Sequence, residues 1–208
     1  MGREKKVIVI GNGASVLERR LGRVVDEFEI VVRINNFRTD SYESHVGSKT
    51  SIWARNQMRN IEKRRTDEFE AIWICLPGWV LRGEYSLIWQ YRRRFREETV
   101  ESLRKRYAGC EVVSAETVTS LERRMGADCE KKCWPSTGLI AIEYAIRRYG
   151  SVWIYGFDHF ARVQGHPRHY FGGLAKMRGH RPHHGELERA YIRSRIEDGS
   201  LERLEDVY

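Results

Sequence analysis

The segment Val7-Ile8-Val9-Ile10-Gly11-Asn12-Gly13-Ala14-Ser15 determines the fold class expected for this chain of 208 residues. Its four consecutive β-branched residues, 7–10, predict a strand that is buried on both faces, as the strands of a parallel sheet are. The Gly11-Asn12-Gly13 sequence predicts a tight turn at the carboxyl end of that strand, and Ser15 is expected to cap a short helix. Open parallel sheets bind their ligands at this edge, so the turn is the first candidate site.

The rest of the chain alternates short apolar runs with charged stretches of helical character, which is typical of βαβ folds. We therefore expect one domain over residues 1–208, with an α/β, Rossmann-like fold and a mostly parallel central sheet flanked by helices. The expected strands are 7–10, 29–34, 51–54, 71–75, 111–113 and 152–155, and the expected helices are 15–20, 84–107, 139–149 and one that starts near residue 186.

The turn lacks the features of a dinucleotide-binding site. A dinucleotide fingerprint has a third glycine where this chain has Val16, and it wants an acidic residue at the end of the second strand. The second strand ends in Arg33-Ile34-Asn35-Asn36. An asparagine amide offers both a donor and an acceptor, which suits a base edge or sugar hydroxyls. NAD binding is therefore disfavoured, and an ordinary tight turn remains the simpler interpretation of residues 11–13.

A second candidate site is Pro135-Ser136-Thr137-Gly138, which opens the helix expected at 139–149. The free N–H groups of the first helical turn, the two hydroxyls and the positive end of the helix dipole together favour an anion. The alternative is that Ser136 only caps the helix.

A third candidate site is histidine-rich, because five of the seven histidines lie between His166 and His184. A loop of this length in a compact domain is commonly functional, and histidine is the natural general base near neutral pH. Glu188 follows His183 by five residues and would sit at a helix start, where it could orient or charge-stabilise the imidazole. A solvated loop is the alternative. No cysteine or pair of carboxylates accompanies these histidines at ligand spacing, so no metal is expected.

The charge balance favours polyanionic partners. The net charge is +8, and the basic stretch from Arg92 to Arg106 carries interleaved glutamates. That stretch is typical of a solvated helix face with i,i+4 pairs, although a nucleic-acid-binding module would also fit.

The chain shows no apolar run of about 20 residues and no secretory signal, which predicts a cytoplasmic location and no transmembrane segment. The four cysteines, Cys75, Cys110, Cys129 and Cys133, are accordingly expected to be reduced thiols.

Taken in order, these segments resemble the motifs of the sialyltransferases. Residues 9–13 through 32–35 resemble the large sialyl motif of the animal-type enzymes, and residues 11–15 are also similar to the start of the bacterial sialyltransferases. Residues 135–138 followed by 152–157 resemble the small motif. His169-Tyr170-Phe171 resembles the third motif, and His183 with Glu188 resembles the last one, His-x4-Glu.

The resemblance implies a fold of the GT-A-variant sialyltransferase type, with donor-binding motifs at 7–36 and 135–158 and a catalytic loop at 159–188. It implies an inverting glycosyltransferase that needs no metal or other cofactor, since no DxD motif is present. Sialic acid, or a related acidic sugar such as Kdo, would pass from a CMP-activated donor to a hydroxyl of a glycan or other acceptor.

The resemblance also implies roles for single residues. Asn12 and Asn35 would contact the CMP moiety, His169 would neutralise its phosphate and His183 would be the general base, with His180 and His184 as rivals for that role. The further substrate-binding residues implied are Gly11, Gly13, Ser136, Thr137, Gly138, Tyr155, Gly156 and Tyr170, and Glu188 would join the catalytic group.

Two departures from the animal enzymes stand out. Those enzymes are anchored in the secretory pathway and have a disulfide between the large and small motifs, whereas the large motif here contains no cysteine. The sequence therefore predicts a cytoplasmic microbial or viral relative. A nucleic-acid-binding module and a catalytically inactive CMP-binding relative are the alternatives, and the sequence does not indicate an oligomeric state.

Overall fold

The computed structural model describes residues 5–58, 61–83, 99–126, 134–159, 169–172 and 183–208. A seven-stranded sheet lies at its centre, in the order β5-β4-β3-β2-β1-β6-β7, and every neighbouring pair of strands is parallel. The strand order reverses at β1, which lies between β2 and β6. The strands are β1 (Val7–Ile10), β2 (Ile30–Ile34), β3 (Ile52–Arg55), β4 (Ala71–Ile74), β5 (Glu111–Val112), β6 (Val152–Tyr155) and β7 (Leu201–Arg203). The expected α/β fold with a parallel sheet is confirmed.

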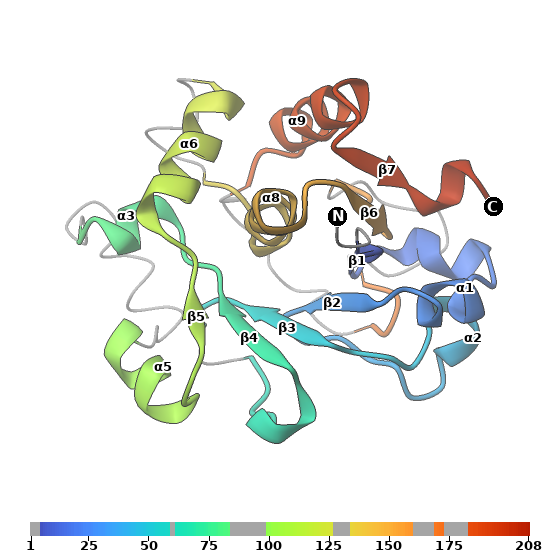
Figure 1. The fold of residues 1–208 in the computed structure, drawn as a ribbon, viewed down its shortest axis with the longest axis horizontal. Coiled ribbons are helices and arrows are strands. Elements are labelled where there is room, and N and C mark those ends of the chain that lie inside the picture. The colour runs from blue at the N-terminus through green and yellow to red at the C-terminus, as the bar shows by residue number, and fades with distance from the viewer. Residues whose placement is uncertain (1–4, 59–60, 84–98, 127–133, 160–168, 173–182) are drawn as a thin grey trace.

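Helices cover both faces of this sheet (Figure 1). One face packs against α6 (Ala115–Met125), α8 (Thr137–Tyr149) and α9 (Gly185–Glu197), and the buried residues of these helices share one core with β1 to β3. The other face packs against α1 (Gly22–Asp26) and α2 (Glu43–Val46) near β1, and against α3 (Gly78–Leu81) and α5 (Val100–Arg106) near β4.

The β1 strand shows why its sequence is continuously apolar. Val7 and Val9 lie in the core beneath α8, whereas Ile8 and Ile10 lie in the core beside α1, and all four side chains are buried. Side chains of a strand alternate between its faces, so a strand covered on both sides needs an apolar residue at every position.

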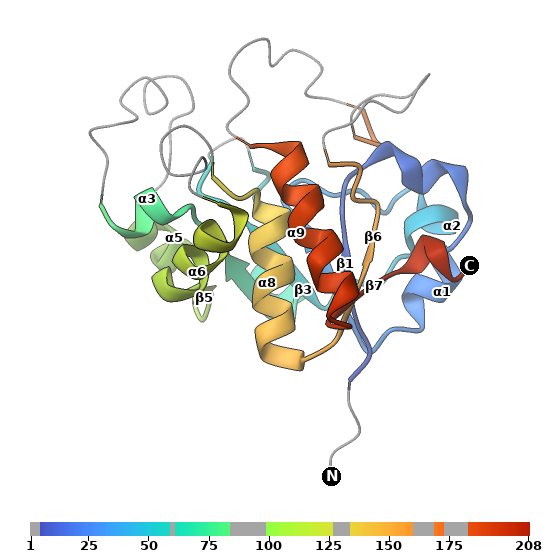
Figure 2. The same ribbon diagram turned by 90° about the horizontal axis from the view of Figure 1, so that it is seen from above.

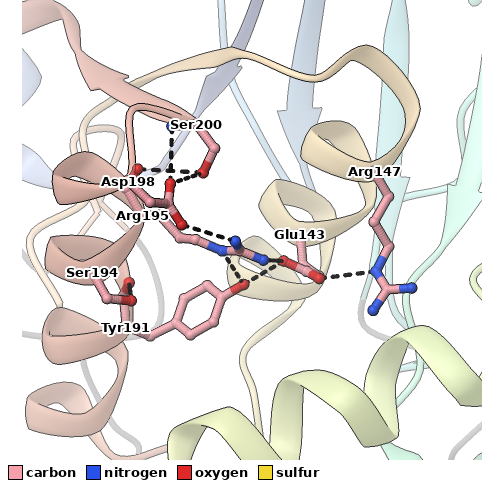
Figure 3. Close-up of polar contacts among 7 residues, drawn as sticks. All are labelled: Glu143, Arg147, Tyr191, Ser194, Arg195, Asp198 and Ser200. Carbon is pink, nitrogen blue, oxygen red and sulfur yellow. Dashed lines mark hydrogen bonds and ion pairs between the residues drawn. The ribbon is translucent and has the colours of Figure 1, made fainter.

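A buried polar cluster joins α8 to α9 (Figure 3). The Glu143 carboxylate, 1% exposed, accepts hydrogen bonds from the Tyr191 hydroxyl, from Arg195 at 2.8 Å and from Arg147 at 2.9 Å. Arg195 also donates to the Tyr191 hydroxyl at 2.8 Å and pairs with Asp198 at 3.1 Å. The cluster therefore fixes the register of one helix against the other.

Several expected elements differ from the structure. Residues 14–18 form a 3-10 helix that Ser15 does not cap, because its hydroxyl donates to Asp158 instead. The long helix expected at 84–107 is seen at Val100–Arg106, and residues 84–98 lie outside the described residues. The helix at Ala115–Met125 and the short edge strand at Leu201–Arg203 were not anticipated.

In the described ranges, no helix combines the length and apolar character that crossing a bilayer requires. Cys75 is buried, and its burial raises the pKa of the thiol, while Cys129 and Cys133 fall outside the described residues.

Candidate active site

The candidate site lies where the carboxyl ends of β1, β2 and β3 meet the start of α8. Figure 2 shows the starts of α8 and α9 on the same side of the molecule as the carboxyl ends of β1 and β6. This is the edge at which parallel α/β sheets bind ligands, next to the reversal of strand order.

The turn after β1 is packed tightly against the segment that follows β6. The N–H of Gly11 donates to the carbonyl of Tyr155 at 2.7 Å, and that of Gly13 donates to the carbonyl of Gly156 at 2.9 Å. A Cβ on Gly11 would lie 2.2 Å from the Gly156 oxygen, so only glycine fits there. Both N–H groups are thus engaged within the protein, and a substrate contact by these glycines stays a prediction.

Two asparagines project from neighbouring strand ends, and a third, Asn56, links one of them, Asn35, to the start of α8. The Asn12 amide donates to the carbonyl of Ile34 at 3.0 Å. Asn35, which adopts a φ of 49°, accepts a hydrogen bond on its side chain from the Asn56 N–H at 3.1 Å. The Asn56 amide in turn donates to the Thr137 hydroxyl at 3.1 Å. These bonds connect the ends of β1, β2 and β3 to the start of α8.

Sequence reasoning missed Asn56. The available signal was its place immediately after a strand, since the carboxyl ends of parallel strands share one edge of the sheet. Asn56 therefore lies at the same edge of the sheet as Asn12 and Asn35, the two asparagines that the sequence indicated.

The start of α8 is capped, as the simpler interpretation of Ser136 predicted. Its hydroxyl accepts a hydrogen bond from the Leu139 N–H at 3.2 Å. Among the described residues, nothing accepts a hydrogen bond from the N–H groups of Thr137 and Gly138. A Cβ on Gly138 would lie 2.8 Å from the Phe157 ring, so the glycine allows the helix to approach β6 closely. Two unused N–H groups at a positive helix end remain suited to an anion.

Glu188 binds the same serine from α9. One carboxylate oxygen accepts from the Ser136 N–H at 2.8 Å and the other from its hydroxyl at 2.9 Å. The side chain is buried, which raises its pKa to about 7 although the Ser136 hydrogen bonds act in the opposite direction. Both carboxylate oxygens are directed at Ser136, and the expected role of Glu188 in orienting or charge-stabilising His183 stays a prediction.

His183 lies beside the segment that leads into α8. Its Nδ1 is 2.9 Å from the carbonyl oxygen of Trp134, and its ring meets the Trp134 ring edge-on, with centroids 6.1 Å apart. A carbonyl only accepts, so Nδ1 carries the proton and the lone pair of the neutral ring is on Nε2. Burial lowers the pKa of His183, which keeps the ring neutral at pH 7.

The rivals for the role of base differ from His183. The ring of His184 is exposed and caps α9, where its Nδ1 accepts from the Leu187 N–H at 3.4 Å. His180 lies outside the described residues. Where the chain is described, no three histidine, cysteine or acidic side chains gather as a potential metal site.

The third motif lies against the first turn. His169 forms an antiparallel bridge with Gly13, and the N–H of Tyr170 donates to the carbonyl of Asn12 at 3.2 Å. The Tyr170 side chain is buried, and its hydroxyl donates to the Arg38 carbonyl and accepts from the Arg38 N–H at 3.1 Å. Its hydroxyl thus holds the loop after β2, and a phosphate contact by Tyr170 stays a prediction.

Two further predicted residues border the site from β6. The Tyr155 side chain is buried on the opposite core face and donates to the carbonyl of Val16 at 3.0 Å, so the structure does not favour a substrate contact by this hydroxyl. Gly156 has a φ of +74°, which glycine tolerates, and a Cβ there would lie 2.4 Å from Val16.

Comparison with known proteins identifies the family. The family model of glycosyltransferase family 29 (sialyltransferase) matches residues 2–199. The chain belongs to glycosyltransferase family 29. Among curated relatives, it is 22% identical to the lactosylceramide alpha-2,3-sialyltransferase of Rattus norvegicus over 96% of this chain, but it spans 56% of that relative's length. Over shorter segments it is 46% identical to the beta-1,6-galactosyltransferase GALT29A of Arabidopsis thaliana, across 21% of this chain and 11% of that protein.

A solved structure of the family has the same fold. The crystal structure of a mammalian sialyltransferase in complex with Gal-beta-1-3GalNAc-ortho-nitrophenol matches with a TM-score of 0.64 and 18% identity. The match covers 96% of this chain and 69% of that one.

Proposed function

We propose that this protein transfers sialic acid, or a related acidic sugar, from a CMP-activated donor to a hydroxyl of a glycan acceptor, with inversion and without a metal. The observation that carries the proposal is the convergence of the ordered motifs on one edge of the sheet: Asn12, Asn35, the start of α8 and His183. The family supports the reaction class, since its members include lactosylceramide alpha-2,3-sialyltransferases.

In the proposed reaction, the donor nucleotide lies between the two asparagines and α8. The amides of Asn12 and Asn35 hydrogen-bond the cytosine and ribose, and the N–H groups of Thr137 and Gly138 bind the phosphate. Negative charge grows on this phosphate as CMP leaves. The helix end and His169 stabilise that charge, which lowers the barrier to departure.

His183 is the proposed general base. Its neutral Nε2 takes the proton of the acceptor hydroxyl while the hydroxyl oxygen forms a bond to the anomeric carbon. The bond from that carbon to the phosphate oxygen breaks, and CMP leaves with the electron pair from the opposite face. Configuration therefore inverts. The Trp134 carbonyl keeps the ring in the tautomer that this step requires.

The first test is a calorimetric titration of the protein with CMP, UMP, AMP and GMP, repeated on Asn35→Ala. Selective CMP binding that weakens in the variant supports the donor site. UMP matters as a competitor, because it differs from CMP only in its pyrimidine base. A lack of preference for CMP would contradict the proposal and favour the nucleic-acid-binding alternative.

The second test measures transfer from CMP-linked sialic acid and CMP-linked Kdo to galactose-terminated acceptors, with and without a chelator. Product formed in both conditions with inverted linkage supports the full proposal. CMP binding with no transfer to any acceptor would point instead to the inactive relative.

A further inference from the structure

An acidic side chain from the segment after β6, Asp158, binds the turn that carries Asn12. The Asp158 carboxylate accepts from the Ser15 N–H at 3.2 Å with one oxygen and from the Ser15 hydroxyl with the other. A carboxylate that receives two hydrogen bonds from one residue fixes both its position and its orientation. The carboxylate also lies over Gly13, where a Cβ would come within 2.5 Å of it.

Main-chain hydrogen bonds also hold the turn. Gly11 and Gly13 donate to the carbonyls of Tyr155 and Gly156, and the third-motif segment pairs with Asn12 and Gly13 from the other side. The N–H groups of Gly11, Gly13 and Ser15 are all engaged within the protein, so these three groups are not available to a phosphate. The turn is a rigid support from which the Asn12 side chain projects toward the end of β2.

We propose that Asp158 is a positioning residue for donor binding, which holds the Gly11–Ser15 turn so that Asn12 meets the nucleotide. This inference rests on the proposed function, which identifies the donor nucleotide as CMP. The carboxylate acts on the donor through the turn, so its loss should weaken donor binding without slowing the chemical step.

The chain contains a matched control at the opposite edge of the sheet. The Asp26 carboxylate accepts from the Ser48 N–H at 2.9 Å and from the Ser48 hydroxyl at 3.0 Å. A Cβ on Gly47 would lie 2.4 Å from Asp26, just as Gly13 is overlain by Asp158. Asp26 precedes β2 and is therefore remote from the carboxyl ends of the strands.

The experiment compares Asp158→Asn with Asp26→Asn. Both variants should lose stability to urea, and Asp26→Asn at least as much, because the Asp26 carboxylate also accepts from the Lys49 N–H at 2.9 Å. Asp158→Asn should weaken CMP binding about 10-fold, from the loss of charge-assisted hydrogen bonds, and raise the donor KM with kcat at saturating donor unchanged. Asp26→Asn should leave CMP affinity and the donor KM at wild-type values.

Hydrogen exchange tests the same inference without a ligand. Asp158→Asn should speed amide exchange across residues 11–18, whereas Asp26→Asn should speed it only around residues 47–49. If Asp158→Asn fails to fold, Ser15→Ala, which removes only the hydroxyl bond, should change both readouts in the same direction by a smaller amount.

Two results would overturn the proposal: wild-type exchange across residues 11–18 in the variant, or an unchanged CMP affinity in a variant of a protein that binds CMP. Wild-type protein that does not bind CMP would instead refute the proposed function, and hydrogen exchange would still decide whether Asp158 holds the turn.

Discussion

At the scale of single residues, the buried Glu188 and the partly buried His183, both near the start of α8, have pKa values displaced in ways that matter for pH dependence. Burial lowers the pKa of His183, and burial raises that of Glu188 to about 7. The histidine is therefore neutral, and available as a base, in a range where an exposed imidazole would begin to protonate. The glutamate gains a proton at a pH where an exposed carboxylate has none.

His183→Ala should reduce turnover by about 10²–10⁴-fold, the usual contribution of a general base, with little change in CMP affinity. In the wild type, kcat should decline on the acid side only below pH 6.5, the ordinary histidine pKa. Burial lowers the pKa of His183, so the base keeps its lone pair to a lower pH than an exposed histidine would. Rate measurements from pH 5 to 8 check both points. Unchanged turnover in His183→Ala would remove it from the mechanism, and His184→Ala serves as the control.

Glu188 should make stability fall as pH rises. Between its ordinary pKa of 4.5 and its folded value of about 7, the folded protein holds a proton that the unfolded chain has released. The free energy of unfolding therefore decreases from about pH 4.5 toward pH 7 through this group. Urea denaturation at several pH values should show this slope in the wild type and its loss in Glu188→Gln. The exposed Glu101→Gln should keep the slope, and a slope retained in Glu188→Gln would contradict the assignment.

At the scale of elements, α8 and α9 are joined at two points, by Ser136 with Glu188 at their starts and by the Glu143 cluster farther along. The first contact touches the site and the second does not. The position of α9 at the site therefore depends in part on the Glu143 cluster, which lies away from the site.

Glu143→Ala should destabilise the protein by about 3–5 kcal/mol, because it leaves Arg195 and the Tyr191 hydroxyl without their buried acceptor. Urea denaturation measures the loss. The matched control is Glu101→Ala, which breaks the Glu101–Lys105 pair, exposed by 78% and 76%, and should cost less than about 0.5 kcal/mol. Equal losses in the two variants would show that burial of the cluster is not what stabilises it.

The sequence predicted the elements whose local pattern is strong. The β-branched run at 7–10 and the apolar stripe of 139–149 lead directly to β1 and α8. The three residues of β7 include two charged ones and have no such pattern. The helix at Ala115–Met125 carries local signals of its own, a Ser114 cap and apolar residues at helical spacing.

Within the site, Asn12, Asn35 and Ser136 could be singled out because they follow or open recognisable elements. The partners of these residues could not. Ser15 reads locally as a helix cap, but its hydroxyl bonds Asp158, 143 residues away. Glu188 likewise bonds Ser136, 52 residues away. Such pairings depend on the order of strands in the sheet, which periodicity does not reveal.

At the scale of the whole molecule, the net charge of +8 creates a field that any polyanion will feel. That field alone produces weak nucleic-acid binding in a protein whose function lies elsewhere. Salt dependence distinguishes such binding from recognition of a nucleotide that carries one phosphate.

RNA binding that used 6–10 phosphate contacts would weaken about 10³–10⁵-fold between 50 and 200 mM salt, whereas CMP binding should weaken far less. Titrations at these two concentrations, with a mixed-sequence RNA and with CMP, check the difference. Tight RNA binding at 200 mM salt with a marked sequence preference would contradict the proposed function.

The placement of β1 between β2 and β6 has a consequence during synthesis of the chain. β2 to β5 add to one side of β1 in the order in which they are made, but its other side waits for residues 152–155. A nascent chain that has reached residue 150 therefore presents Val7–Ile10 as an open, wholly apolar edge, which invites aggregation. Once residues 152–155 and 201–203 have been made, β6 covers that edge and β7 lies outside it, where the Glu202 and Arg203 side chains oppose pairing with another sheet.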